Sequence, residues 1–84
     1  MSQIRPAPQV TVYHAADCHL CERALEIVDG VRRELQFDLE LVDIGGDAEL
    51  EARYREFLPV VEVDGERAFT YFVDAGAFRR RLSR

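Results

Sequence analysis

The sequence contains two cysteines, Cys18 and Cys21, separated by only two residues. They lie where a loop-like stretch, residues 14–17, passes into a helical pattern. A pair with this spacing can supply half of a metal site, form a structural disulfide or carry a reversible redox couple. A disulfide that closes so short a loop removes little conformational entropy from the unfolded chain, which argues against a structural bridge.

The position of the pair at a helix start predicts different roles for the two sulfurs. If Asp17 or Cys18 caps the helix, the free N–H groups of its first turn favour a Cys18 thiolate and lower the pKa of this thiol. Cys21 lies one turn deeper and farther from solvent. We therefore expect Cys18 to attack a disulfide sulfur and Cys21 to resolve the mixed disulfide. His19 either adds positive charge beside the thiolate or faces solvent.

A zinc site is the alternative that uses the same segment. His14, Cys18, His19 and Cys21 would make a tetrahedral set of two cysteines and two histidines. Structural zinc sites usually draw ligand pairs from two separated segments, and the sequence has no second pair downstream. His19 and Cys21 also point to different sides of a helix. The sequence therefore predicts no metal bound within one chain, and leaves a metal or cluster shared between two chains as an alternative.

The first half of the chain predicts two strands around one long helix. Residues 10–13 are β-branched and aromatic, which is typical of a central strand. From Leu20 onward, apolar residues recur every three or four positions and predict a helix. In residues 37–44 apolar and acidic residues alternate, which favours a strand with one solvent-exposed face near a sheet edge. The residues expected on the buried face of the helix are Leu20, Ala24, Ile27, Val28, Val31 and Leu35.

The second half predicts a short helix, a hairpin and a closing helix. Asp47 caps a helix over residues 48–57, and Asp64-Gly65 forms a two-residue turn between strands 59–63 and 67–72. Asp74 caps the last helix, whose arginines lie at a solvated helix end. The order β-α-β-α-β-β-α predicts an α/β fold with a four-stranded mixed sheet and three helices on its two faces. The inward residues expected here are Leu50, Tyr54, Phe57, Phe78 and Leu82.

Length and charge restrict the function further. Eighty-four residues, 48% of them hydrophobic, build one modest core, so we expect a tail over residues 1–8 and a single domain over residues 9–84. The net charge of -5 argues against nucleic acid or an anionic membrane as the partner. The sequence shows neither a signal peptide nor an apolar run long enough to span a bilayer. These features predict a cytoplasmic monomer, and in that reducing compartment a cysteine pair indicates catalysis or metal binding.

The chain resembles the thioredoxin fold, and within it the small glutaredoxin-like proteins. The resemblance rests on Cys18-His19-Leu20-Cys21 at a helix start and on Leu58-Pro59-Val60 before the hairpin. It implies a thiol–disulfide oxidoreductase in which Cys18 is the nucleophile, Cys21 the resolving thiol and Pro59 a cis-proline. His19, Leu20, the Leu58 backbone and Asp74 would contact the substrate. The implied substrates are protein disulfides or mixed disulfides, with no bound cofactor and with glutathione or another small thiol as the reductant.

The sequence departs from that family at the loop before the last helix. Glutaredoxins that use glutathione commonly carry Gly-Gly before the aspartate, whereas this chain has Tyr71-Phe72-Val73 before Asp74. Bulky residues stand where glycine permits close approach to the backbone, so the substrate class stays open between protein disulfides and small mixed disulfides. Two other functions also stay open. These are a metal or iron–sulfur carrier, and a thioredoxin-fold binding module without catalytic activity.

Overall fold

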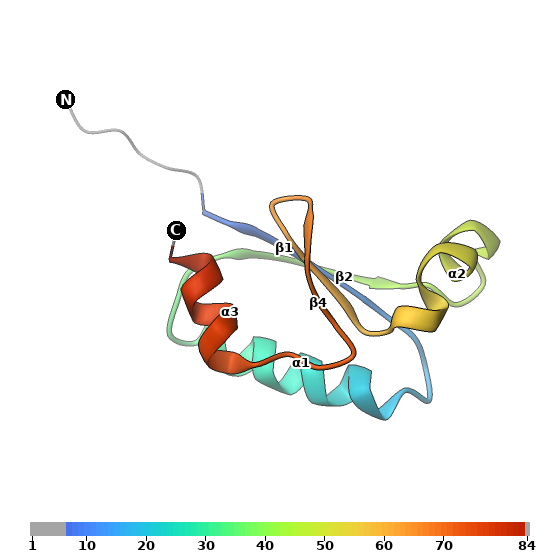
Figure 1. The fold of residues 1–84 in the computed structure, drawn as a ribbon, viewed down its shortest axis with the longest axis horizontal. Coiled ribbons are helices and arrows are strands. Elements are labelled where there is room, and N and C mark those ends of the chain that lie inside the picture. Colours follow the sequence, from blue (N-terminus) through green and yellow to red (C-terminus); the bar gives the residue numbers. More distant parts are fainter. Residues whose placement is uncertain (1–6, 84) are drawn as a thin grey trace.

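The structure, a computed structural model, describes residues 7–83. The predicted order of strands and helices is confirmed, with one short 3-10 helix, η1, added before the third strand (Figure 1). Within the described residues, no helix has both the length and the apolar content needed to cross a lipid bilayer. The elements are β1 (Gln9–His14), α1 (His19–Arg32), β2 (Asp38–Asp43), α2 (Ala48–Tyr54), η1 (Arg55–Phe57), β3 (Val60–Val63), β4 (Glu66–Thr70) and α3 (Ala75–Leu82).

The four strands form one mixed sheet in the order β2-β1-β3-β4. β1 runs parallel to β2, with Val10 beside Leu39, and antiparallel to β3. The central position of β1 and the edge position of β2 are both as predicted. Asp64 and Gly65 have φ angles of 51° and 81°, and both signs fit the predicted turn between β3 and β4.

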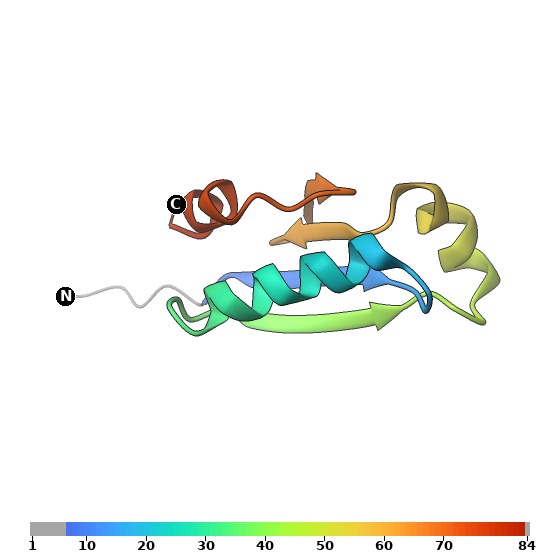
Figure 2. The same ribbon diagram turned by 90° about the horizontal axis from the view of Figure 1, so that it is seen from below.

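Two helices cover one face of the sheet. α1 and α3 pack against the face that carries Val10, Val12 and Val61, and Figures 1 and 2 show both helices beside the strands. Phe78 of α3 is fully buried and meets Phe37 and Phe69 edge-on, with ring centroids 5.6 and 6.1 Å apart. This larger apolar cluster, here called the main cluster, consists of Val10, Val12, Ala24, Val28, Val31, Phe37, Val61, Val63, Val73, Phe78 and Leu82.

α2 covers only one end of the opposite face. Its Tyr54 ring stacks on Tyr13 of β1, with centroids 3.9 Å apart. Farther along this face, Glu40 and Arg67 are exposed, so the middle of the face is polar and open. The prediction that helices cover both faces is therefore right for the end that carries Tyr13 and wrong for the rest of the second face. The smaller cluster at this end, here called the site cluster, consists of Ala15, Cys21, Ile44, Tyr54, Leu58 and Val60.

Segments near both ends of the described chain contact other elements. Residues 1–6 of the predicted tail and Arg84 lie outside the described residues. Pro8, immediately before β1, accepts a hydrogen bond through its carbonyl oxygen from the Asp38 N–H at 2.9 Å. The last arginines lie along α3, where Arg79 pairs with Glu34 at 2.8 Å and Arg81 pairs with Glu66 at 3.0 Å. The Glu34 carboxylate raises the pKa of the Arg79 guanidinium further.

Asp74 caps α3, as the sequence predicts. Its Oδ2 accepts a hydrogen bond from the Ala77 N–H at 2.8 Å, and buried Val73 and Phe78 flank the cap. We expect Asp74→Ala to lower the free energy of unfolding by about 1 kcal/mol, because an N–H of the first turn loses its partner. Urea denaturation measures this loss. Asp74→Asn should stay near wild type, since asparagine caps equally well, and an Asp74→Ala midpoint equal to wild type would contradict the capping role.

Candidate functional site

The first cysteine of the pair caps the N-terminus of α1. Asp17, with φ of 57°, turns the chain out of the loop, and Cys18 then adopts an extended conformation with φ of -118°. The Cys18 Sγ accepts a hydrogen bond from the Cys21 N–H at 3.1 Å. An N-cap side chain normally uses oxygen for this bond, so the sulfur occupies the position of a capping oxygen. One free N–H of the helix therefore already points at the sulfur where a thiolate would carry its charge.

The second cysteine lies behind the first and is shielded from solvent. Only 2% of Cys21 is exposed, whereas Cys18 is half-buried. The two residues lie at disulfide distance, with Cα atoms 5.2 Å apart. Cys21 belongs to the site cluster, whose other members are apolar or aromatic. The expected asymmetry between an accessible and a shielded sulfur is confirmed.

The loop before β3 lies against the cysteine pair. Leu58 is 8% exposed and belongs to the same apolar cluster as Cys21. The peptide bond between Leu58 and Pro59 is cis, as the resemblance implies. The contact of the Leu58 backbone with substrate stays a prediction.

The segment after β4 joins this loop, and it is the part of the site that the sequence analysis missed. The Tyr71 N–H donates to the Pro59 carbonyl at 3.0 Å, and the Tyr71 hydroxyl donates to the Glu56 carbonyl at 2.9 Å. Phe72 is 73% exposed. The sequence analysis placed both residues in a strand over residues 67–72 and noted them as departures from a glycine pair, whereas β4 ends at Thr70. Two adjacent aromatic residues between a strand and a helix cap were the signal available.

Two tyrosines close the site cluster on the α2 side. Tyr13 stacks on Tyr54, whose hydroxyl donates to the Glu62 Oε2 at 3.5 Å. A hydrogen bond with Tyr54, then burial, and then the negative charge of Glu62 raise the pKa of Tyr13 above its usual value. Burial and the Glu62 charge both disfavour a Tyr13 phenolate. Tyr13 is therefore an uncharged aromatic wall of the site at neutral pH.

The remaining predicted residues lie outside the packed centre of the site. His19 is exposed on the first turn of α1, and Leu20 is half-buried beside it. Both line a shallow hollow along the outer side of α1 together with Glu22, Arg23 and Glu26. Over residues 7–83, no three side chains from His, Cys, Asp and Glu come together as a metal shell. The zinc set that includes His14 is thus not assembled within this part of the chain.

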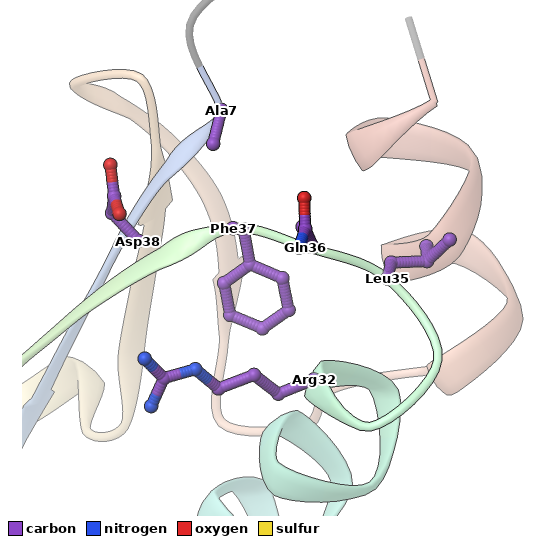
Figure 3. A pocket seen from close by; sticks show the side chains of 6 residues that line it. All are labelled: Ala7, Arg32, Leu35, Gln36, Phe37 and Asp38. Atoms are coloured by element: carbon purple, nitrogen blue, oxygen red, sulfur yellow. The ribbon is translucent and has the colours of Figure 1, made fainter.

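Another hollow, of about 400 Å³, lies at the far end of α1 (Figure 3). Figure 3 shows the Phe37 ring pointing toward the side chain of Arg32, the last residue of α1. Because α1 has 14 residues, about 20 Å of helix separates this hollow from Cys18. The hollow therefore takes no part in cysteine chemistry. Its lining residues are Ala7, Arg32, Leu35, Gln36, Phe37 and Asp38.

Comparison with known proteins agrees with this arrangement. A model of the Glutaredoxin-like domain (DUF836) matches residues 9–83. An uncharacterized protein of Mycobacterium tuberculosis is 32% identical over an 82-residue alignment that covers 92% of this chain and 84% of that protein. The solution structure of protein Ne2328 from Nitrosomonas europaea covers 98% of both chains, with a TM-score of 0.77 and 26% identity.

Two further solved structures are similar. The X-ray structure of protein XcR50 from X. campestris is 32% identical, has a TM-score of 0.74, and matches 88% of this chain and 95% of that chain. A thioredoxin from Halobacterium salinarum matches 93% of this chain and 74% of its own, with a TM-score of 0.69 and 16% identity. At that identity the thioredoxin supports the fold alone. The fold that the sequence predicted, thioredoxin-like, is confirmed.

Proposed function

The chain belongs to the glutaredoxin-like domain family, and from this premise we propose that it is a thiol–disulfide oxidoreductase that reduces disulfides through Cys18 and Cys21. One observation carries the proposal. The sulfur of Cys18 is half-buried and already accepts a helix N–H, while the Cys21 sulfur lies behind it at disulfide distance. A reactive thiolate needs stabilisation and access, and its resolving partner needs proximity.

The proposed reaction has two exchange steps. The Cys18 thiolate attacks one sulfur of the substrate disulfide, the substrate S–S bond breaks, and its other sulfur leaves as a thiolate that takes a proton from water. Cys21 then loses its proton and attacks the Cys18 sulfur. This step forms the Cys18–Cys21 disulfide and releases the second substrate sulfur, so the substrate gains two electrons and the protein loses two. A small thiol such as glutathione, acting in excess, returns the pair to the dithiol.

The helix cap predicts the reactivity of the free thiol. We expect iodoacetamide at pH 7 to modify Cys18 of the reduced protein at least about fivefold faster than free cysteine, because the helix N-terminus favours the thiolate. Cys21 should stay unmodified in the folded protein, since it is 2% exposed. Peptide mass spectrometry over a time course measures both rates. Protein in urea is the control, in which the two cysteines should react alike.

A direct test uses a small neutral disulfide. Reduced protein is mixed with hydroxyethyl disulfide, and the thiols released and the mass of the intact protein are followed together. We expect reduction faster than by dithiothreitol at equal concentration, with the protein losing two hydrogen atoms as its own disulfide forms. Protein blocked beforehand with iodoacetamide should be inactive. Reduction no faster than that by dithiothreitol, for this disulfide and for insulin, would overturn the proposal.

The metal-carrier alternative receives no support from the donor arrangement within residues 7–83. Elemental analysis of anaerobically purified protein tests the remaining form, a metal or cluster held between two chains. Stoichiometric iron or zinc that thiol alkylation releases would favour that alternative. Protein without metal that reduces disulfides would support the oxidoreductase.

A further inference from the structure

An exposed aromatic residue lies next to the cysteine pair. Leu58 packs with Cys21 in the site cluster, Pro59 follows Leu58, and the Pro59 carbonyl accepts the Tyr71 N–H. Phe72 comes directly after Tyr71 and is 73% exposed, the largest exposure of any large apolar side chain among the described residues. Figures 1 and 2 both place the end of β4 beside the start of α1. Contacts and chain neighbours therefore connect the cysteine pair, through Leu58, Pro59 and Tyr71, to an uncovered phenyl ring.

The backbone that presents this ring is strained. Tyr71 has φ of 66°, a left-handed conformation that a bulky residue rarely adopts. Its N–H bond to Pro59 and its hydroxyl bond to Glu56 hold it there from two sides. Strain of this kind persists where surrounding contacts impose it, and it is common at sites that bind or react. The two bonds hold Tyr71 against the loop before β3, while Phe72 stands out into solvent.

Carboxylates surround the same edge of the molecule. Asp17 precedes Cys18, Glu22 donates its N–H to the Cys18 carbonyl, Glu56 accepts the Tyr71 hydroxyl through its carbonyl, and Asp74 follows Phe72 by two residues. All four side chains are exposed, and none of them forms an ion pair with another described residue. Arg23, next to Glu22, offsets one of these charges, and Arg79, whose pKa the Asp74 charge helps to raise, offsets a second. The edge is therefore acidic, in a chain whose net charge is already -5.

On the basis of the proposed function, we propose that Phe72 determines specificity for a partner protein whose disulfide lies in a cationic segment with an apolar side chain beside the cysteine. The apolar side chain would cover the Phe72 ring, and the cations would face the four carboxylates. Glutathione carries two carboxylates and one ammonium group, so the acidic edge disfavours it relative to a cationic segment.

The test compares substrates with one leaving group. Three peptides with a single cysteine, and glutathione, are each prepared as the mixed disulfide with thionitrobenzoate. The first peptide has leucine beside the cysteine and arginines around it; the second replaces leucine with serine, and the third replaces the arginines with glutamates. We expect reduced wild-type protein at low salt to react with the first peptide about fivefold faster than with the second, and about tenfold faster than with the third or glutathione.

Variants assign the apolar preference to one residue. Phe72→Ser should bring the ratio of rates for the first and second peptides to about one, and Phe72→Leu should keep most of that ratio. Leu41→Ser is the matched control, because Leu41 is 51% exposed on β2, the edge strand opposite β4. The Leu41→Ser variant should show the same ratio of rates for the first and second peptides as wild type. Wild-type rates that do not differ among the four substrates, or an equal loss in Leu41→Ser, would overturn the inference.

The two proposals fail in different ways. Wild-type reaction with hydroxyethyl disulfide, a neutral molecule that has neither a cation nor an apolar side chain, reports the oxidoreductase alone. If this reaction is fast and the peptide ratios are near one, the docking role of Phe72 is wrong and the oxidoreductase stands. If glutathione reacts as fast as the first peptide, the charge preference is wrong. If hydroxyethyl disulfide is not reduced either, the oxidoreductase fails and the docking inference that rests on it falls too.

Discussion

Cys18→Ser is expected to lose disulfide reduction by at least about a hundredfold, whereas Cys21→Ser should form a mixed disulfide with its substrate and stop there. The difference follows from the structure. Cys18 is the accessible sulfur at the helix start, and Cys21 is the buried sulfur that lies behind it. Without Cys18 no attack occurs. Without Cys21 the first exchange proceeds, but the covalent complex has no thiol inside the protein to resolve it.

Two measurements separate these outcomes. Turnover with a small disulfide gives the loss of activity, and non-reducing gels or intact-mass spectra give the trapped complex with a protein substrate. Serine is itself a good N-cap, so Cys18→Ser should keep the helix cap and its far-ultraviolet circular dichroism. A loss of activity without a loss of structure then reports the sulfur. Equal turnover by wild type and Cys18→Ser, or a complex trapped on Cys18→Ser instead of Cys21→Ser, would contradict the assigned roles.

Phe78→Ala is expected to remove a large share of the stability of the domain. The Phe78 ring is fully buried and meets Phe37 and Phe69, so its removal leaves a cavity between α3 and the sheet. Truncating a buried phenylalanine costs about 3–5 kcal/mol. A chain of 84 residues has a total free energy of unfolding of about 4–13 kcal/mol. The variant should therefore unfold at a much lower urea concentration and a lower temperature than wild type, which urea denaturation and thermal melts will show.

Two further variants control for this effect. Phe78→Leu keeps most of the buried volume and should lose less than half as much stability as Phe78→Ala. Phe72→Ala removes the same ring from a position that is 73% exposed and should cost well under 1 kcal/mol. Unfolding of Phe78→Ala and Phe72→Ala at the same urea concentration would contradict the packing of Phe78 between α3 and the sheet.

Local signals in the sequence were sufficient to predict the order of elements. Asp47 and Asp74 each cap a helix through bonds to residues two or three positions away, and Asp64-Gly65 makes a turn within itself. Such features depend on neighbours along the chain, so the sequence displays them directly. The same holds for Cys18 and Cys21, which meet because one turn of helix brings them together. The asymmetry of the pair was therefore predictable before any fold was known.

Features that depend on distant residues were not predictable in this way. Tyr71 is left-handed because Pro59 and Glu56, which are 12 and 15 positions away, hold its N–H and hydroxyl. The stack of Tyr13 on Tyr54 joins residues 41 positions apart. The alternation of residues 37–44 predicts that Leu41 lies on the buried face of its strand. Half of Leu41 is nevertheless exposed, because β2 is an edge strand. Each of these depends on tertiary packing, which periodicity and propensity do not encode.

The apolar interior is divided into two clusters, and substitutions in one of them need not disturb the other. The main cluster holds the helices α1 and α3 on the sheet and contains neither cysteine, whereas the site cluster contains Cys21 and the loop before β3. Substitutions that retune reactivity or partner choice fall on the smaller cluster and its rim, where they leave the principal source of folding energy intact. The scaffold can therefore tolerate divergence at its reactive end, and new substrate preferences can arise there without a new fold.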